Sequence, residues 1–148
     1  MRAWRLARRR YAALDGAGAR RYGGRWNRPG LPIVYASEHL SLAVLEIIVH
    51  LEVALDEFPA DYVKIAIDVP DALSIRRVER LPKAEAEMTE IGSRWYESGS
   101  SAALAVPSIV VPEEFNLLFN PEHAEFRKVK AAAPEPFRFD RRLLLHAS

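Results

Sequence analysis

An apolar run that carries one carboxylate is the feature that most constrains this chain. Between positions 40 and 51 the only ionisable side chains are Glu46 and His50. The run predicts a helix that starts near Glu38, with Ser37 as its N-cap, and continues to position 51. A helix that is apolar on nearly every side is typical of a buried element. We therefore expect this helix to lie in the interior of the fold.

Glu46 lies in the middle of that helix and needs a partner or a chemical role. A buried carboxylate is unfavourable unless it is paired, hydrogen-bonded or protonated. His50 lies one helical turn further on and shares its face. The nearest candidate cations in the sequence are Arg25 and Arg28. Two interpretations stay open, a structural ion pair beneath a loop and a carboxylate within a small-molecule site.

The segment before the helix favours a site. It contains Gly23-Gly24, Arg25, Trp26-Asn27, a second turn at Arg28-Pro29-Gly30 and a β-rich run at Ile33-Val34-Tyr35. Paired glycines let the backbone turn and approach a ligand closely. A glycine turn, an arginine, a tyrosine and a carboxylate in one short segment indicate a small-molecule site with an anion clamp.

Bulk properties limit the alternatives. The 148 residues carry 21 Lys and Arg against 20 Asp and Glu, a net charge of +1, so no large field of one sign attracts nucleic acid. The chain has no cysteine, which excludes thiolate chemistry, and its four histidines show no metal-ligand spacing. We expect one domain over residues 1–148, no metal and a cytoplasmic location. No apolar window is long enough to span a membrane, and the basic start lacks the apolar core of a signal peptide.

The rest of the pattern indicates a mixed α+β domain. Strands are predicted at Trp4–Leu6 and Val63–Val69, and a helix at Lys83–Glu97 with Trp95 facing the core. Phe126, Val129, Phe137 and Phe139 fit later strands. These strands and helices do not alternate as they do in a doubly wound sheet.

The apolar run at 102–111 contains a hydroxyl. Pro107 favours an extended backbone before it, and Ile109–Val111 then predicts a buried strand that Ser108 enters. Loop signals at 113–116 and 120–123 flank Leu117–Phe119. No glycine follows Ser108 in a nucleophile-elbow pattern, which argues against a hydrolase triad. From the pattern alone, Ser108 is a small residue tolerated in a strand.

Five fragments together carry a family resemblance. They are Gly23-Gly24-Arg25-Trp26-Asn27, Tyr35-Ala36-Ser37, Leu45-Glu46, Val106-Pro107-Ser108 and Asn120-Pro121-Glu122-His123. In this order and spacing they resemble the RES-domain toxins, and the resemblance runs from Trp4 to about Arg127. It implies an ADP-ribosyltransferase-like fold, with a mixed β-sheet core and flanking helices.

The resemblance also implies a site. The family arginine, glutamate and serine match Arg25, Glu46 and Ser108, and Tyr35 matches the active-site tyrosine. Arg5 matches an arginine of the first strand. The expected catalytic set is Arg25, Tyr35, Glu46 and Ser108, and the expected cofactor-binding set is Arg5, Arg25, Asn27 and Tyr35.

The activity implied is that of a toxin from a toxin–antitoxin pair that cleaves the nicotinamide–ribose bond of NAD, by hydrolysis or phosphorolysis. NAD is then the substrate, and a helix-turn-helix antitoxin covers the active site. A homodimer within the toxin–antitoxin complex is a further expectation. An ADP-ribosyltransferase that modifies a protein is the first alternative, and an RNA-targeting toxin or a non-catalytic binding module is the second. The near-zero net charge counts against direct nucleic-acid binding.

Overall fold

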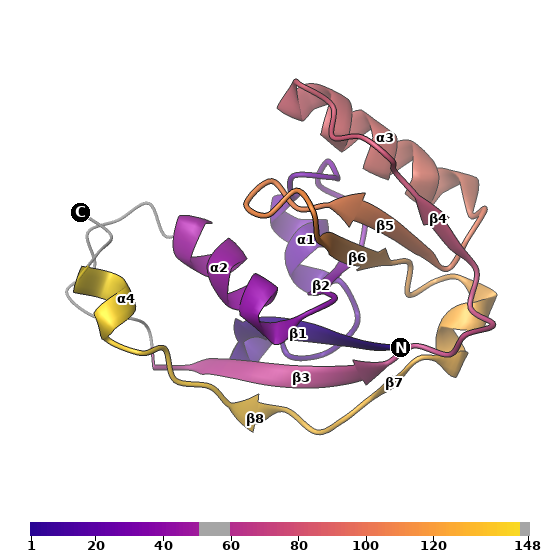
Figure 1. The fold of residues 1–148 in the computed structure, drawn as a ribbon. Helices are drawn as coiled ribbons and strands as arrows, with labels where there is room; N and C mark the ends of the chain where they lie inside the picture. The colour runs from indigo at the N-terminus through magenta and orange to yellow at the C-terminus, as the bar shows by residue number, and fades with distance from the viewer. Residues whose placement is uncertain (51–59, 146–148) are drawn as a thin grey trace.

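A mixed β-sheet forms the centre of the molecule. The computed structural model describes residues 1–50 and 60–145 (Figure 1). The strands are β1 (Arg2–Arg8), β2 (Val34–Ser37), β3 (Tyr62–Asp68), β4 (Ile75–Arg77), β5 (Ala103–Pro107), β6 (Phe115–Phe119), β7 (Lys130–Ala131) and β8 (Glu135–Pro136). Their order is β4-β5-β6-β2-β1-β3-β7, and β8 also pairs with β3. Only β4 and β5 run parallel among the described pairs.

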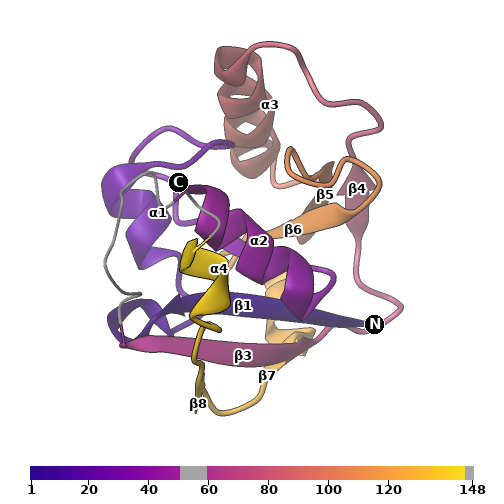
Figure 2. The same ribbon diagram turned by 60° about the vertical axis from the view of Figure 1, so that its left-hand side comes forward.

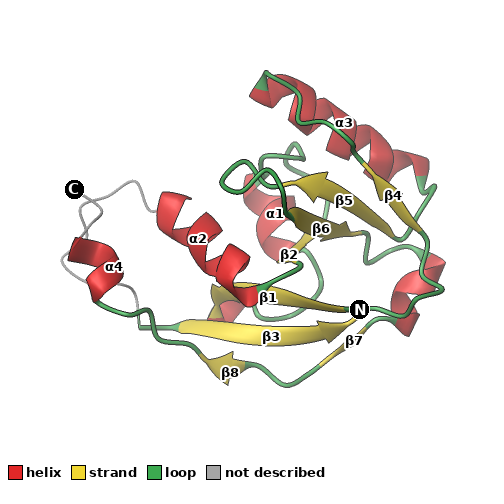
Figure 3. Cartoon of the chain, in the orientation of Figure 1, coloured by secondary structure: helices red, strands yellow, loops and turns green. Residues whose placement is uncertain are grey.

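Helices are interspersed between these strands, as Figure 3 shows. They are α1 (Ala17–Tyr22), α2 (Leu40–His50), α3 (Glu85–Ser98) and α4 (Arg142–Leu145), with 3-10 turns η1 (Arg9–Tyr11) and η2 (Ala124–Lys128). The prediction of a mixed α+β fold is confirmed. No helix within the described residues is both long and apolar enough to cross a membrane.

One face of the sheet curves around an apolar core. Alternation along β3 buries Val63, Ile65 and Ile67. These side chains belong to the same apolar cluster as Ala105 of β5 and Phe119 of β6. Because β6, β2 and β1 lie between β5 and β3 in the sheet, the cluster shows that the sheet curls around it.

The other face is covered by two helices, α3 over one half and α2 over the other (Figure 2). Met88 and Trp95 of α3 pack against Leu104 of β5. Ala43 of α2 packs against Leu6 of β1 in a separate cluster. The predicted helix at 83–97 and the core position of Trp95 are confirmed, with bounds shifted by one or two residues.

Helix α2 departs from the sequence prediction in two ways. It begins at Leu40, and Ser37 is the last residue of β2, where its hydroxyl donates to Asn116 Oδ1 at 2.7 Å instead of capping the helix. The predicted end at position 51 lies outside the described residues. The prediction of burial on every side is wrong, because Leu45 and Val49 are 40% and 54% exposed. Only one face of α2 meets the sheet.

The predicted strand at Ile109–Val111 is also wrong. The strand is β5, which ends at Pro107, and Ser108 follows it. The Ser108 hydroxyl accepts the backbone N–H groups of Val110 and Val111, each at 3.0 Å. These bonds close a tight turn and remove both amides from the sheet.

Two further segments differ from the prediction. Phe115 and Asn116, which carry loop signals, form the start of β6. Phe126 lies in η2, and Val129 lies between η2 and β7. Phe137 and Phe139 follow β8 without being part of a strand. Their rings pack edge to face on each other, 5.1 Å between centroids. The Phe137 N–H also donates to the Tyr62 carbonyl of β3 at 2.9 Å, which extends the contact between β8 and β3 by one residue.

Gly92 allows α3 to approach the segment that precedes β2. A Cβ atom placed on Gly92 would collide with the backbone carbonyl of Trp26. We predict that Gly92→Ala lowers the free energy of unfolding by about 1–3 kcal/mol, because the helix must move away from its packed position. Urea denaturation of both proteins measures this difference.

Gly18→Ala is the matched control. Gly18 lies within α1, and an added Cβ would meet only the Tyr11 ring at 3.5 Å, an ordinary contact. Its unfolding free energy should stay the same or rise. Equal stability of the Gly92 and Gly18 variants would contradict the close packing of α3.

Candidate active site

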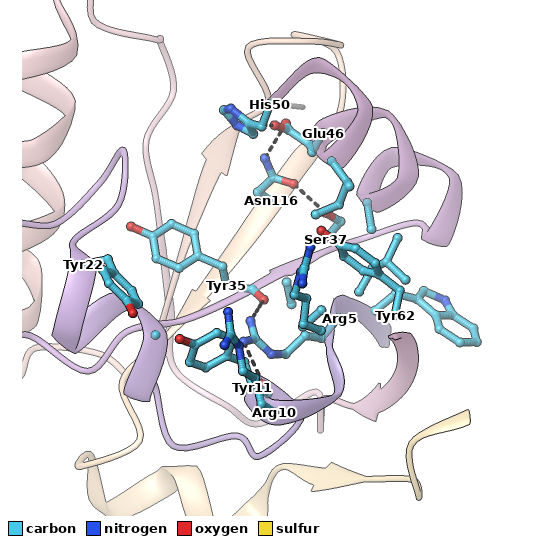
Figure 4. Close-up of a pocket in the computed structure, with 18 residues that line it drawn as sticks. Arg5, Arg10, Tyr11, Tyr22, Tyr35, Ser37, Glu46, His50, Tyr62 and Asn116 are labelled. Atoms are coloured by element: carbon cyan, nitrogen blue, oxygen red, sulfur yellow. Dashed lines mark hydrogen bonds and ion pairs between the residues drawn. The ribbon is translucent and has the colours of Figure 1, made fainter. Parts of the chain in front are cut away.

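A cleft opens on the face of the sheet that carries α2 and α3. It has a larger lobe of about 520 Å³ and a smaller lobe of about 360 Å³. Four of the described residues line both lobes and mark their junction: Tyr35, Glu46, His50 and Asn116. Figure 4 shows the larger lobe, with Glu46, His50 and Asn116 together above the Tyr35 ring. The junction thus combines residues from α2, β2 and β6.

Glu46 is held by one carboxylate oxygen. Its Oε1 accepts hydrogen bonds from the Ser108 hydroxyl at 2.6 Å and from Asn116 Nδ2 at 2.9 Å. Its Oε2 lies 4.0 Å from Arg25 Nη1 and 3.8 Å from His50 Nε2. The side chain is 13% exposed. One oxygen is therefore fixed by the protein, while the other takes part only in longer ionic contacts at the lobe junction.

Ser108 reaches the site only through Glu46. It is completely buried and lines neither lobe. Its hydroxyl donates to the carboxylate and accepts two backbone N–H groups, which uses its hydrogen-bonding capacity. This geometry makes Ser108 a support for the carboxylate.

Asn116 is the site residue that the sequence did not reveal. Strands β2 and β6 pair Ser37 with Asn116, and the Ser37 hydroxyl donates to the amide oxygen. That bond turns the amide NH₂ group toward Glu46. Residues 37 and 116 are far apart along the chain, so only strand pairing brings them together. No local pattern could have indicated this contact.

Tyr35 and Asn27 brace the glycine turn. The Tyr35 hydroxyl donates to Asn27 Oδ1 at 2.6 Å and accepts the Trp26 N–H at 3.1 Å. Burial raises the pKa of the Tyr35 phenol, so it stays a neutral donor. A Cβ atom on Gly24 would lie 2.6 Å from the Tyr35 hydroxyl, so this position requires glycine. The phenol and the turn therefore fit each other closely.

Asn27 supports the turn from beneath. It is 1% exposed and lines neither lobe. Its Nδ2 donates to the backbone carbonyls of Ala19, Arg28 and Leu31 at 2.9–3.2 Å. The side chain is fully engaged within the protein, unlike that of Tyr35, which lines both lobes.

The two arginines near the turn separate in space. Arg25 lines the smaller lobe and is 24% exposed. Arg28 points to α3 instead, where it forms an ion pair with Glu97 at 2.6 Å. The sequence indicated Arg25 and Arg28 as candidate partners of Glu46, and of these two only Arg25 lies next to the carboxylate.

Arg5 lies in the wall of the larger lobe. Its Nη1 donates to the Tyr35 carbonyl at 2.9 Å and its Nη2 to the Tyr11 carbonyl at 3.1 Å. Its buried Nε has no hydrogen-bond partner in the described part of the chain. Burial lowers the pKa of this guanidinium, although the nearby Asp15 carboxylate raises it. An arginine remains cationic under such conditions, so Arg5 brings a positive charge to the lobe.

One group outside the cleft could hold a metal ion. The side chains of Glu38, His39 and Glu114 place one ligand atom each within 4.8 Å of one another. Glu38 Oε1 already accepts the Phe115 N–H at 3.0 Å. The group lies apart from both lobes, and the prediction that the site uses no metal stays a prediction.

The Tyr35 hydroxyl should contribute to stability as well as to the site. We predict that Tyr35→Phe lowers the free energy of unfolding by about 1–3 kcal/mol, because the buried Asn27 Oδ1 and the Trp26 N–H lose their partner. Tyr96→Phe is the matched control, since the Tyr96 hydroxyl is buried with no partner among the described residues. Denaturant titration of the control should show unchanged or higher stability. A Tyr35→Phe protein as stable as this control would disprove the bracing role.

Comparison with known proteins places this geometry in a family. The RES domain family matches residues 2–140. The proteins named Toxin Res from Photorhabdus laumondii and Pseudomonas putida are 40% and 37% identical, each over 95% of this chain and 96% and 97% of their own lengths. A Prs ADP-ribosylating toxin from Sphingobium is 39% identical over 97% of both chains.

A solved structure shares the fold. It is the crystal structure of the M. tuberculosis MbcT–MbcA toxin–antitoxin complex, with a TM-score of 0.75 and 18% identity over 99% of this chain and 87% of that one. The family match covers both halves of the cleft, from Arg5 on β1 to Asn116 on β6. The three related proteins are named as toxins. The chain therefore belongs to the RES domain family.

Proposed function

We propose that this protein is the toxin of a toxin–antitoxin pair and that it cleaves the nicotinamide–ribose bond of NAD. The observation that carries the proposal is the position of Glu46. Its Oε1 is held by Ser108 and Asn116, and its Oε2 lies at the junction of two lobes. A fixed carboxylate between two lobes suits a substrate whose reacting bond lies between a part bound in one lobe and a part bound in the other.

The chemistry needs negative charge near the ribose. When the C–N bond breaks, its electron pair passes to the nicotinamide ring, which leaves as a neutral molecule. The ribose C1′ then acquires oxocarbenium character. Glu46 Oε2 would stabilise that positive charge and accept a hydrogen bond from a ribose hydroxyl, as carboxylates do in glycoside cleavage. The partial burial of Glu46 strengthens this effect because little water screens it.

An arginine on each side of the lobe junction suits the binding of the NAD pyrophosphate next to Glu46. Arg25 lies beside Glu46 in the smaller lobe, and Arg5 lies in the wall of the larger one. Guanidinium groups bind phosphate oxygens through paired donors. The Tyr35 ring lines both lobes and would pack against the ribose or the nicotinamide.

The acceptor distinguishes two reactions. Water or phosphate forms a new bond to C1′ with its oxygen and loses a proton, which yields free ADP-ribose or its phosphate ester. A protein side chain would instead retain the ADP-ribosyl group. Transfer to a protein is the alternative function, because this chain is 39% identical to a Prs ADP-ribosylating toxin.

An antitoxin partner suits the exposed surface beside the site. Leu45 and Val49 of α2 and Ile109 of the turn after Ser108 are large apolar side chains, 40%, 54% and 40% exposed. Apolar groups of this size favour burial against a partner. We propose that a helix-turn-helix antitoxin covers this surface and the cleft, in the cytoplasm where NAD is available.

Glu46→Gln should separate fold from activity. The amide has the shape of the carboxylate and can still accept from Ser108 and Asn116, but it lacks the charge. We predict that NAD consumption falls about a hundredfold or more, by analogy with the loss of one group that stabilises transition-state charge. The assay follows NAD loss by purified antitoxin-free protein, with and without phosphate. The unfolding midpoint should change little.

Glu79→Gln is the control. This exposed glutamate follows β4 at the opposite edge of the sheet. It should consume NAD at the rate of the unaltered protein. Undiminished turnover by Glu46→Gln would refute the proposed role of the carboxylate, and labelled ADP-ribose retained on a protein would favour the transferase.

A further inference from the structure

The larger lobe is strongly basic. Arg5, Arg8 and Arg10 line it, and Glu46 at the junction is the only carboxylate among the described residues of its wall. The smaller lobe has a different balance, with Arg25 against Glu46 and Glu85. The two lobes therefore differ in the balance of charged side chains that line them.

This difference in charge between the two lobes favours one orientation of a dinucleotide that lies across their junction. The nicotinamide ring of NAD carries a positive charge, which the two carboxylates of the smaller lobe would favour. The ADP half is larger and anionic, so the larger and more basic lobe suits it. With C1′ of the nicotinamide ribose at Glu46, the adenosine ribose lies in the lobe that Arg5, Arg8 and Arg10 surround.

Arg10 has no counter-ion among the residues that the structure describes around that lobe. Arg8 lies 3.7 Å from Asp61, whereas Arg10 forms no ion pair with any described residue. Its guanidinium lies over the Tyr11 ring, 5.1 Å from the centroid, which holds it at the wall of the lobe.

Two tyrosines, Tyr11 and Tyr22, lie beside Arg10. The proximity of the Tyr22 phenol raises the pKa of Tyr11, chiefly because that phenol acts as its hydrogen-bond partner. Both rings line the larger lobe, next to Arg10 and Tyr35 (Figure 4). Aromatic faces beside a cation with no counter-ion suit a purine nucleoside that carries an additional phosphate.

We propose that the larger lobe binds a 2′-phosphorylated adenosine ribose, so that the protein consumes NADP as well as NAD. The inference rests on the proposed cleavage of the nicotinamide–ribose bond and specifies its substrate class. NADP carries a phosphate monoester of nearly two negative charges on the adenosine ribose. Arg10 supplies the unengaged guanidinium for that group, and the bond that breaks is the same in both dinucleotides.

The kinetic test compares the two substrates. Purified antitoxin-free protein receives NAD or NADP, and kcat/KM is determined for each by loss of the intact dinucleotide. We expect NADP to be consumed at least as efficiently as NAD. Arg10→Gln should lower the ratio of the NADP value to the NAD value about tenfold, as loss of one charged hydrogen bond predicts. Arg80→Gln, at the far edge of the sheet beyond β4, should leave the ratio unchanged.

A binding test does not need turnover. Calorimetry on the Glu46→Gln protein compares adenosine 2′,5′-bisphosphate with 5′-AMP. The bisphosphate should bind about tenfold more tightly, and Arg10→Gln introduced into the same protein should remove the difference. The preference should also weaken at high salt, because the phosphate meets an exposed guanidinium.

The outcomes separate this inference from the function on which it rests. Consumption of NAD without NADP, or a ratio unaffected by Arg10→Gln, overturns the inference and leaves NAD cleavage intact. Equal affinity for the two nucleotides overturns it in the absence of any turnover. If neither dinucleotide is consumed, the proposed cleavage fails, and the binding comparison still decides whether the lobe holds a 2′-phosphate.

Discussion

The hydrogen bonds to one oxygen of Glu46 are the interaction on which the site depends. A carboxylate in the middle of an apolar helix is unfavourable until its charge is compensated. Ser108 and Asn116 provide that compensation from the end of β5 and the start of β6. Because they occupy the same oxygen, the other oxygen stays directed to the lobe junction. The same two hydrogen bonds thus compensate the carboxylate charge and orient the oxygen that faces the cleft.

The curl of the sheet makes this arrangement possible. Its inner face encloses the core, so the helices need to cover only the outer face. Since α3 packs on one half and α2 on the other, part of the outer face stays open, and the cleft lies there. The same division turns one face of α2 away from the sheet, which accounts for the exposure of Leu45 and Val49.

The named residues around the cleft share three physical tasks. Asn27 and the Tyr35 hydroxyl hold the glycine turn, and Ser108 holds the carboxylate. Arg25 and Arg5 bring positive charge to opposite lobes. Buried, fully hydrogen-bonded groups support the exposed ones, so the geometry of the cleft follows from interactions beneath its surface.

The predictions that succeeded concern local patterns. Alternation along 63–69 indicated β3, and helical spacing with Trp95 on one face indicated α3. The pairing of Glu46 with Arg25 and His50 follows from proximity in the chain and helical periodicity. These features depend on neighbours along the sequence, so the sequence contains the information needed to recognise them.

The failures have two origins, a local side-chain hydrogen bond in one case and a contact between distant segments in the other. The apolar run at 109–111 resembled a strand, but the Ser108 hydroxyl binds its amides and closes a turn. Ser37 had the composition of an N-cap, but pairing with β6 occupies its hydroxyl. In the first case a local hydrogen bond from the chain to a serine hydroxyl replaced strand pairing, and in the second a bond between distant strands replaced a local helix cap.

The sequence by itself determined the fold class, the family resemblance and the unusual carboxylate of α2. Only the tertiary structure decided what that carboxylate contacts and which cations face the cleft. Asn116 shows the reason, because its contact with Glu46 requires the register of β2 with β6 and the position of α2 on the sheet at the same time. Local patterns indicate which residues are unusual, whereas strand pairing and packing decide which of them meet.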